Sequence, residues 1–378
     1  MTDELAEIKE KYADERRTEI VPHAINEISQ KDTIPNEPMI VMLSRENYIK
    51  RISPSTFRTQ HRGGKGIIGG TTKDEDEIKL IRYATNHEEL LYFTNKGRVF
   101  RLPVYEVPQA SRTAKGQAVV NLLQLQENET VTAILNAGEK FNGKYLFMST
   151  KKGTVKKTPV EDFKNVRKSG LIAIKLRPGD SLEWVKECNE KNEIIIITKN
   201  GKCIRFKEEN VRPMGRPSIG VRGILVKEGD TVVEMDVIKD PATNELLVVM
   251  ENGLGKMTKI TGYRLQGRGG SGVKTANITT KTGKIIGAKV LSKETDADLI
   301  MISKAGQLIR LHSKNIPSQG RATQGVYLMR LNPNDKVASI SMIDTMASEA
   351  HEQQEALDKA KALKEKEIKQ ETKVAIKS

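Results

Sequence analysis

The sequence of 378 residues has few aromatic side chains: phenylalanine, tryptophan and tyrosine make up only 4% of it. Aromatic rings are the platforms on which proteins stack unpaired bases, so their scarcity argues against a single-stranded nucleic-acid partner. It also argues against a scaffold that binds other proteins through aromatic anchors on its surface. A partner recognised through charge fits this composition better.

Cysteine, histidine and long apolar runs are also scarce. The two cysteines, Cys188 and Cys203, and the five scattered histidines have no zinc-ligand spacing, and two cysteines make no disulfide framework. We expect both cysteines to be reduced and to lie in strands. No stretch approaches 18 apolar residues, and the N-terminal MTDELAEIKEKYADERR lacks the apolar segment of a secretory signal. The sequence therefore predicts a cytoplasmic protein without a metal site.

Positive charge is abundant and concentrated. The chain has 63 Lys+Arg against 49 Asp+Glu, a net charge of +14, and its isoelectric point is about 9.5. Residues 1–38 carry a net charge of −5 and residues 346–378 a net charge of zero, so the middle of the chain carries +19. Such a balance favours a polyanionic partner, and the scarcity of aromatics favours a duplex recognised through its backbone.

The basic middle is built from six repeats. In each repeat, an apolar run is followed by a short polar turn and a second β-rich run, as in ELLYF-TNKG-RVFRL. The turns share an anchor residue that tolerates positive φ, and the anchors are 48 to 56 residues apart: Asn47, Gly97, Gly153, Gly201, Gly253 and Gly306. A second glycine follows each anchor after 17 to 19 residues: Gly66, Gly116, Gly170, Gly220, Gly272 and Gly325. Repeats of this size with several strands predict an all-β, six-bladed, propeller-like disc.

Cations recur at fixed places in the repeats. Arginine lies four residues before the second glycine in five of the six: Arg62, Arg112, Arg216, Arg268 and Arg321. The third repeat is shorter there and has Arg167 and Lys168, and Lys115 and Lys274 lie beside the second glycines of their repeats. Residues at equivalent positions of successive blades lie at one height, so we expect a basic belt around the rim.

A second set of cations lies four residues after the turn anchors: Arg51, Arg101, Lys157, Arg205 and Arg310. Because they alternate with apolar residues along a strand, the period of two predicts that they face solvent and extend the belt. The alternative is that these strand cations only protect sheet edges from aggregation.

The flanks differ from the repeats. Residues 1–35 have a helix-forming composition and are interpreted as the end of a longer helix and a linker. Residues 36–345 are expected to form the disc, and residues 346–378 to form a polar helix or a disordered tail.

Three features together resemble one known family: the stretch QHRGGKG, the six repeats, and YADERRTEI before them. They are similar to the C-terminal domain of the DNA gyrase A subunit, preceded by the last turns of its coiled-coil connector. The signature box of that family is Gln-Arg/Lys-Arg-Gly-Gly-Lys-Gly, and this sequence keeps Gln60, Arg62, Gly63, Gly64, Lys65 and Gly66. It departs from the box at His61, where a permanent cation is usual.

The resemblance implies a six-bladed β-pinwheel with strand exchange between neighbouring blades. It implies that double-stranded DNA bends around the basic rim in a positive wrap, with the box required, and so supports negative supercoiling by this type IIA topoisomerase. The implied partners are the remainder of the gyrase A subunit and the gyrase B subunit, and the ATP and Mg²⁺ would belong to this rest of the holoenzyme. The chain has no region for the catalytic tyrosine, so it is not expected to be catalytic alone or to need a cofactor, and it is expected to be associated with the nucleoid.

Other functions fit parts of the pattern. A topoisomerase IV-type domain would have a degraded box, and a separate reading frame would suit a stand-alone nucleoid-associated DNA-binding protein. A propeller scaffold for acidic proteins would need apolar or aromatic anchors on the disc. A propeller enzyme would need polar residues that converge on the central channel, and the repeats indicate none.

Overall fold

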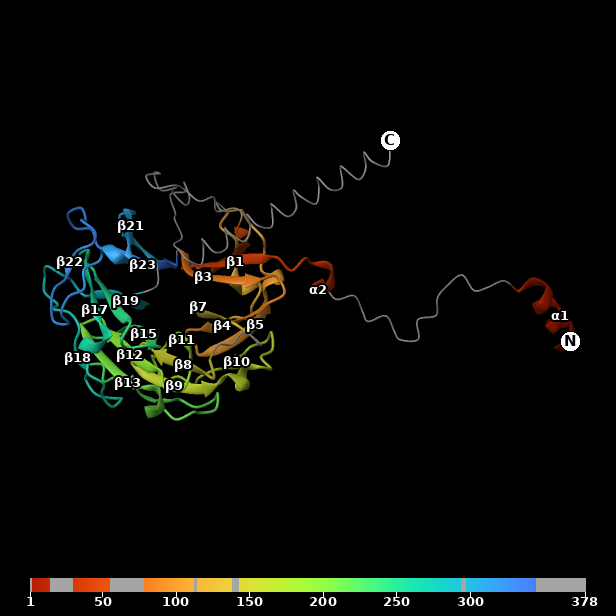
Figure 1. The fold of residues 1–378 in the computed structure, drawn as a ribbon, viewed down its shortest axis with the longest axis horizontal. Helices are drawn as coiled ribbons and strands as arrows, with labels where there is room; N and C mark the ends of the chain where they lie inside the picture. The colour runs from red at the N-terminus through yellow and green to blue at the C-terminus, as the bar shows by residue number, and fades with distance from the viewer. Residues whose placement is uncertain are drawn as a thin grey trace, which may run out of the picture.

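Each of the six repeats forms one antiparallel sheet around its predicted turn. The computed structural model describes residues 2–13, 30–54, 78–111, 114–137, 143–293 and 297–344. Figure 1 shows the sheets arranged as blades around a common centre. Blades one to six contain, in chain order, β1 (Pro38–Ser44), β2 (Tyr48–Ile52) and β3 (Ile78–Thr85); β4 (Glu89–Thr94), β5 (Arg98–Pro103) and β7 (Val131–Asn136); β8 (Tyr145–Thr150), β9 (Thr154–Pro159) and β11 (Leu182–Cys188); β12 (Glu193–Thr198), β13 (Lys202–Lys207) and β15 (Val232–Ile238); β16 (Asn244–Met250), β17 (Leu254–Lys259) and β19 (Ile285–Ser292); and β20 (Ala297–Ser303), β21 (Leu308–His312) and β23 (Val337–Asp344). The prediction of an all-β, six-bladed disc is confirmed.

Neighbouring blades exchange a short strand. Directly after its second glycine, each of repeats two to six supplies two residues that pair with the second strand of the preceding blade: β6 (Gln117–Ala118), β10 (Leu171–Ile172), β14 (Val221–Arg222), β18 (Val273–Lys274) and β22 (Val326–Tyr327). The order in the first sheet is accordingly β3-β1-β2-β6, and among the described residues the sixth sheet has three strands. The exchange that the resemblance implied is present, and it fixes the loop before each short strand at the outer edge of the previous blade.

Helices are short outside the N-terminal segment. The helix expected near the start is α1 (Thr2–Tyr12), which buries none of its residues, and α2 (Gln30–Thr33) precedes blade one. Single turns of 3₁₀ helix follow the blade strands: η2 (Val104–Glu106), η3 (Val119–Asn121), η4 (Val160–Phe163), η5 (Glu208–Asn210), η6 (Ile260–Gly262) and η7 (Ser313–Asn315). In the part of the chain that the structure describes, no helix has the length and apolar character needed to cross a bilayer.

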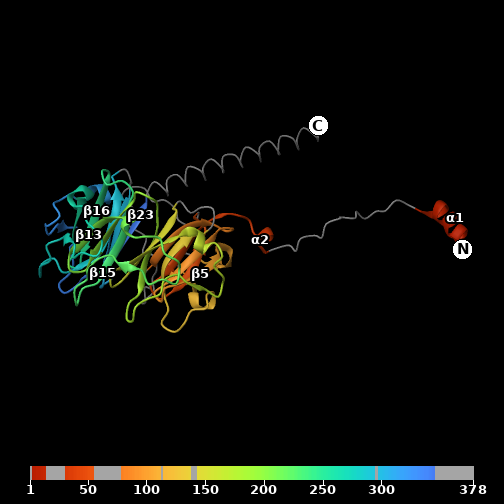
Figure 2. The same cartoon turned by 90° about the horizontal axis from the view of Figure 1, so that it is seen from below.

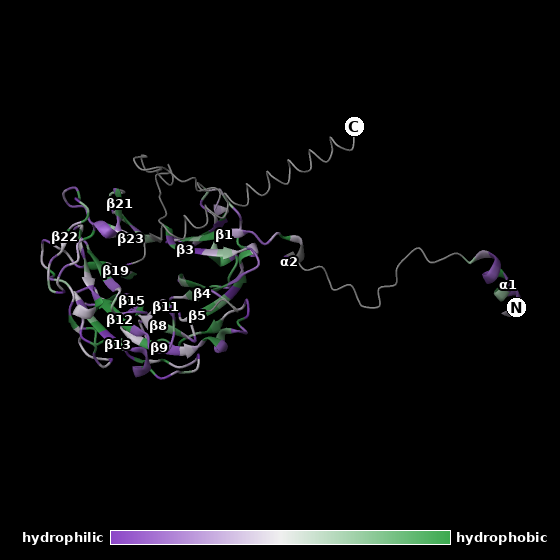
Figure 3. Cartoon of the chain, in the orientation of Figure 1, coloured by the Kyte–Doolittle hydropathy of each residue, from purple (hydrophilic) through white to green (hydrophobic). Residues whose placement is uncertain are grey.

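The hydrophobic cores lie between adjacent blades. One core joins Leu91 and Phe93 of blade two to Val160 and Phe163 of blade three, with the two phenylalanine rings edge to face at 5.9 Å. The first strand of a blade is covered on both faces, and β16 is buried throughout, which explains why these strands are continuous apolar runs. Figure 2 shows the same blades turned by 90° and seen from below. In Figure 3 the hydrophobic colour follows the blade strands, and the hydrophilic colour is stronger along the loops at the outer edge.

Both cysteines are reduced and lie in strands, as predicted. Cys188, in β11, and Cys203, in β13, are free and buried. Burial raises the pKa of Cys188 to about 12, so this thiol stays protonated and unreactive at neutral pH.

The glycines of the repeat are required by the backbone. The described second glycines all have positive φ, and so do the turn anchors, from Asn47 at 62° to Gly153 at 84°. At Gly220, with φ of +92°, an added Cβ would lie 2.4 Å from the carbonyl oxygen of Val155 in the preceding blade. The second glycine therefore allows both the left-handed turn and the close approach from which the short strand pairs.

A pair of alanine substitutions separates these two requirements. Gly229 also has positive φ (+73°) but has no atom within 4 Å of its added Cβ. We expect Gly229→Ala to lower the free energy of unfolding by about 1 kcal/mol from backbone strain alone. Gly220→Ala should lower it by about 3 kcal/mol or more, because the carbonyl must also move. Urea unfolding of both variants checks this, and equal losses would show that the close approach is unimportant.

Candidate nucleic-acid interface

The strand cations are largely internal, so the prediction that they face solvent is wrong for several of them. Lys157 and Arg205 are buried, at 4% and 8% exposure. Lys157 forms an ion pair with Glu208, and Arg205 forms one with Glu193 at 2.6 Å. Arg101 is half-buried and pairs with Glu89.

The remaining strand cations are only partly free. Arg310 is exposed but is paired with Asp298, and half-buried Arg51 donates to the Asn86 amide oxygen. The strand cations therefore offer less charge to a ligand than the sequence suggested.

The reason lies in what covers the second strand of a blade. The guanidinium of Arg205 donates to the carbonyl oxygens of Ile260 (3.0 Å) and Tyr263 (2.7 Å). Ile260 lies in η6 of the next blade, and Tyr263 directly follows η6. Lys157 likewise reaches the backbone oxygen of Glu208 in η5. The period of two identified the face of the strand correctly, but the 3₁₀ turn of the next blade covers that face. These cations fasten one blade to the next.

The loop cations have a different environment. Lys115, Arg167, Lys168, Arg268 and Lys274 are exposed. Two of them have exposed or partly exposed carboxylate partners: Lys115 lies 2.9 Å from Glu46, and Lys168 lies 2.5 Å from Glu106. Surface pairs of this kind are weak and can exchange for an anionic ligand.

Two of the loop arginines, Arg268 and Arg321, are held by carbonyl groups rather than by carboxylates. Arg268 donates from Nε to the oxygen of Asn210 (2.9 Å) and from Nη1 to the oxygen of Arg222 (3.2 Å), and Arg321 donates to the oxygen of Lys274 (3.0 Å). Arg216 and Arg321 are half-buried. Within the described ranges, no carboxylate lies at salt-bridge distance from any of four loop arginines: Arg167, Arg216, Arg268 and Arg321. Their charge therefore remains available, and several N–H donors of each guanidinium remain unused.

The same contacts join the loops into a series. Arg268 and Arg321 each reach a carbonyl of the preceding repeat, and the backbone adds further links: Gly269 N donates to Gly223 O at 2.6 Å, and Asn277 N donates to Thr323 O at 3.1 Å. Arg268 is thereby placed against Arg222, and Arg321 against Lys274. The cations of successive loops follow one another along the outer edge of the blades.

Arg222 was missed in the sequence. It is exposed on β14 and lies two residues after Gly220, just as Lys274 lies two residues after Gly272. The sequence does contain a pattern that could have identified Arg222, because a short run recurs after each second glycine and places Arg222 and Lys274 at the same position. That pattern indicates exposure only once the run is known to form the outermost strand of a blade.

A family model named DNA gyrase C-terminal domain, beta-propeller, matches the chain six times, at residues 38–82, 88–137, 144–189, 192–239, 244–292 and 297–344. The chain belongs to this family. Curated relatives include the DNA gyrase A subunit of Staphylococcus epidermidis, 42% identical over 90% of this chain, and that of Staphylococcus aureus strain MRSA252, 39% identical over 94%. The chain spans only 38% and 40% of the length of these relatives.

Solved structures agree with the family in fold. One titled "Structure of DNA gyrase A C-terminal domain" covers 81% of this chain and 100% of its own, with 27% identity and a TM-score of 0.64. A C-terminal domain of DNA topoisomerase IV covers 84% of this chain and 99% of its own, with 24% identity and a TM-score of 0.68. At that identity the second likeness shows the fold alone.

Two parts of the predicted gyrase-type interface lie outside the described residues. These are the box, Gln60, His61, Arg62, Gly63, Gly64, Lys65 and Gly66, and the loop cation Arg112. Their roles stay predictions that rest on the resemblance and on their register with the other loops.

Charged residues converge on the centre of this gyrase-family ring, which the repeats did not indicate. The innermost strands β11, β15 and β19 pack together (Figure 1). Lys186 lies 2.7 Å from Asp236 and 3.4 Å from Glu234, and Lys289 adds a second cation. Burial alone would lower the pKa of Lys186, but the two carboxylates raise it above its ordinary value. Two cations face two carboxylates, so this cluster joins blades three, four and five. Burial raises the pKa of Glu234, and the neighbouring charge of Lys186 lowers the pKa of Lys289.

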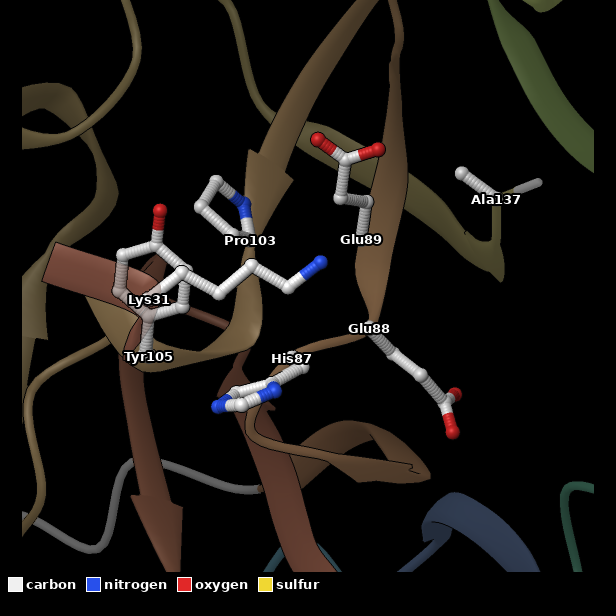
Figure 4. A pocket seen from close by; sticks show the side chains of 7 residues that line it. All are labelled: Lys31, His87, Glu88, Glu89, Pro103, Tyr105 and Ala137. Carbon is white, nitrogen blue, oxygen red and sulfur yellow. The ribbon is translucent and has the colours of Figure 1, made fainter. Parts of the chain in front are cut away.

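A polar hollow beside α2 gives no support to an enzymatic function. It is lined by Lys31, His87, Glu88, Glu89, Pro103, Tyr105 and Ala137, and Lys31 points toward Glu89 (Figure 4). Glu89 is already paired with Arg101, and the His87 Nε2 lies 2.7 Å from the carbonyl oxygen of Ile34. The His87 contact links blade two to Ile34, the residue that follows α2.

The internal role of the strand cations is testable at Lys157. We expect Glu208→Gln to lower the free energy of unfolding by about 3 kcal/mol or more, because it leaves a buried ammonium without its counter-charge. The double variant Lys157→Met, Glu208→Gln should recover most of the loss, since neither charge then remains. Urea unfolding checks both. A neutral effect of Glu208→Gln would show that the pair is solvated after all.

Proposed function

We propose that the chain binds double-stranded DNA along its outer edge and bends the duplex around the disc. The observation that carries the proposal is the series of loop arginines, which lack carboxylate partners among the described residues. Two of them, Arg268 and Arg321, are linked to the preceding repeat through carbonyl groups. A ligand that touches all of these loops must be long, curved and anionic. Membership of the gyrase family supports DNA as that ligand.

The energetics require a series of cations rather than one patch. B-DNA carries one negative charge per about 1.7 Å of axis, and each phosphate neutralised by a cation releases bound counterions. Smooth bending of a 20–30 bp site by 40–90° costs roughly 1–6 kcal/mol. Contacts must therefore continue along the bend to offset this cost, and the recurrence of cations on successive blades meets that condition.

Binding should depend little on base sequence. Guanidinium and ammonium groups on loops contact phosphates, which carry no sequence information, and no helix in the described ranges beyond α1 is longer than four residues. The specificity is then for duplex shape and bendability.

Within a larger enzyme the wrap would serve supercoiling. The relatives are gyrase A subunits, so a positive wrap presented to the rest of such a protein, together with the gyrase B subunit, would support negative supercoiling. ATP and Mg²⁺ would belong to those partners, so this chain would act without a cofactor, in the cytoplasm and on the nucleoid. The box residues Gln60 to Gly66 would complete the track at the first blade.

One exposed loop arginine tests the proposal. Arg268→Ala should weaken binding of a 40–60 bp duplex by about three- to tenfold and reduce the slope of log affinity against log salt by about one phosphate contact. The matched control is Lys144→Ala, which removes one charge from an exposed pair with Glu190 before β8 and should change affinity less than twofold. Fluorescence anisotropy across a salt series measures both. Equal effects of the two variants would mean that the loops have no special role.

A further inference from the structure

A buried lysine recurs in alternate blades. Three residues after the turn anchor, repeats one, three and five have Lys50, Lys156 and Lys256, whereas the even-numbered repeats have the apolar residues Phe100, Ile204 and Ile309. Lys156 and Lys256 are both 0% exposed, and Lys50 is half-buried. An ammonium placed in a core at the depth of Lys156 and Lys256 is costly unless it is fully hydrogen-bonded.

The partners of these ammonium groups are the carbonyls of the loop in the next repeat. Lys256 Nζ donates to the backbone oxygens of Gly320 (2.8 Å), Arg321 (2.7 Å) and Thr323 (3.1 Å), and the Thr323 hydroxyl lies at 3.1 Å. The ammonium is therefore surrounded by the segment that presents Arg321.

The third blade repeats the arrangement. Lys156 Nζ donates to the oxygen of Ala173 at 2.6 Å and also to the oxygen of Arg216, the equivalent loop arginine of the fourth repeat. In blade one, Lys50 Nζ lies 2.7 Å from the oxygen of Ala114, in the loop of the second repeat. In three blades, therefore, the lysine at this position donates to a backbone carbonyl of the loop in the next repeat.

Within the described residues, Lys156 and Lys256 have no carboxylate at bonding distance, so their ammonium groups donate only to backbone carbonyls and, for Lys256, to the Thr323 hydroxyl. Burial lowers the pKa of both lysines to about 8. The charged groups that act on them are Asp162 and Arg216 for Lys156, and Arg321 for Lys256. A methionine of similar length would fill the core without this cost, which points to a role for the charge in the loop above it.

We propose that Lys156 and Lys256 are positioning residues, whose ammonium groups clamp the backbone at Arg216 and Arg321 and so hold these arginines in line with the DNA track. The inference rests on the proposed function and adds to it the residues that set the geometry of the rim. The clamp acts through the loop, so neither lysine touches the duplex.

The clamp gives opposite pH trends for binding and stability. As the pH rises through about 8, the folded-state ammonium groups lose their proton, the loops are held less tightly and DNA affinity should fall. In the unfolded chain these lysines keep their proton up to the ordinary lysine pKa of 10.5. Between about pH 8 and 10.5 the unfolded state therefore binds more protons, and the contribution of these lysines to folding stability rises with pH. A merely structural role predicts no loss of affinity in that range.

A double-mutant cycle tests the clamp at pH 7. Lys256→Met should weaken binding of a 40–60 bp duplex about three- to tenfold and reduce the salt slope by about one contact, as Arg321→Ala should. Because the lysine acts through this arginine, the double variant should bind no more weakly than Arg321→Ala alone. The matched control is Ile204→Met at the same position of blade four, which should leave affinity within about twofold. Wild-type affinity should also fall between about pH 7 and pH 9.5, and that fall should be smaller in Lys256→Met.

The outcomes separate the two proposals. Losses that multiply in the double variant, or an unaltered affinity in Lys256→Met, would overturn the clamp while DNA binding stands. A wild-type chain that does not bind the duplex would overturn the proposed function itself. If Lys256→Met does not fold, as judged by circular dichroism, Lys156→Met with Arg216→Ala provides the same cycle, and the wild-type pH profile needs no variant.

Discussion

The pairing of a two-residue strand with the preceding blade is the constraint on which the rest of this structure depends. It requires a glycine with positive φ before the strand, because any side chain at Gly220 would meet the carbonyl of Val155. It also fixes the end of each outer loop relative to the neighbouring blade. A loop that is fixed in this way can present a cation at the same height in successive repeats, so a local backbone requirement determines the spacing of charge around the disc.

Two sets of cations share one blade but do different work. Arg205 and Lys157 point under the 3₁₀ turn of the next blade and bond to carbonyls and carboxylates, so their charge is neutralised within the fold. Arg268 and Arg321 lie in the loops at the outer edge and donate only to carbonyl oxygens, so no carboxylate neutralises their charge and a ligand at the surface can meet it. Counting basic residues in the repeat overestimates the charge that a ligand meets, and the partner of each cation decides which set it belongs to.

The repeat, the blades and the turn glycines could be predicted because they follow from local backbone chemistry at a constant spacing. The exposure of the strand cations could not, since alternation along a strand tells which face a side chain takes but not what covers that face. The central cluster around Lys186 and Asp236 could not be predicted for a related reason: its members come from three repeats and meet only when blades three, four and five pack together. In the sequence, Lys156 and Lys256 cannot be distinguished from ordinary exposed strand lysines, because only the structure shows that they are buried.

The most direct test of a continuous, curved track is the change in DNA linking number. A nicked circular plasmid is ligated in the presence of increasing amounts of the wild-type chain, and its topoisomers are then separated on a gel. Wrapping in the positive sense should raise the linking number in proportion to the bound protein, and the shift should disappear at high salt as phosphate contacts are lost. Binding without any shift, or a shift of negative sign, would contradict the account, because the cations would then hold DNA without leading it around the disc.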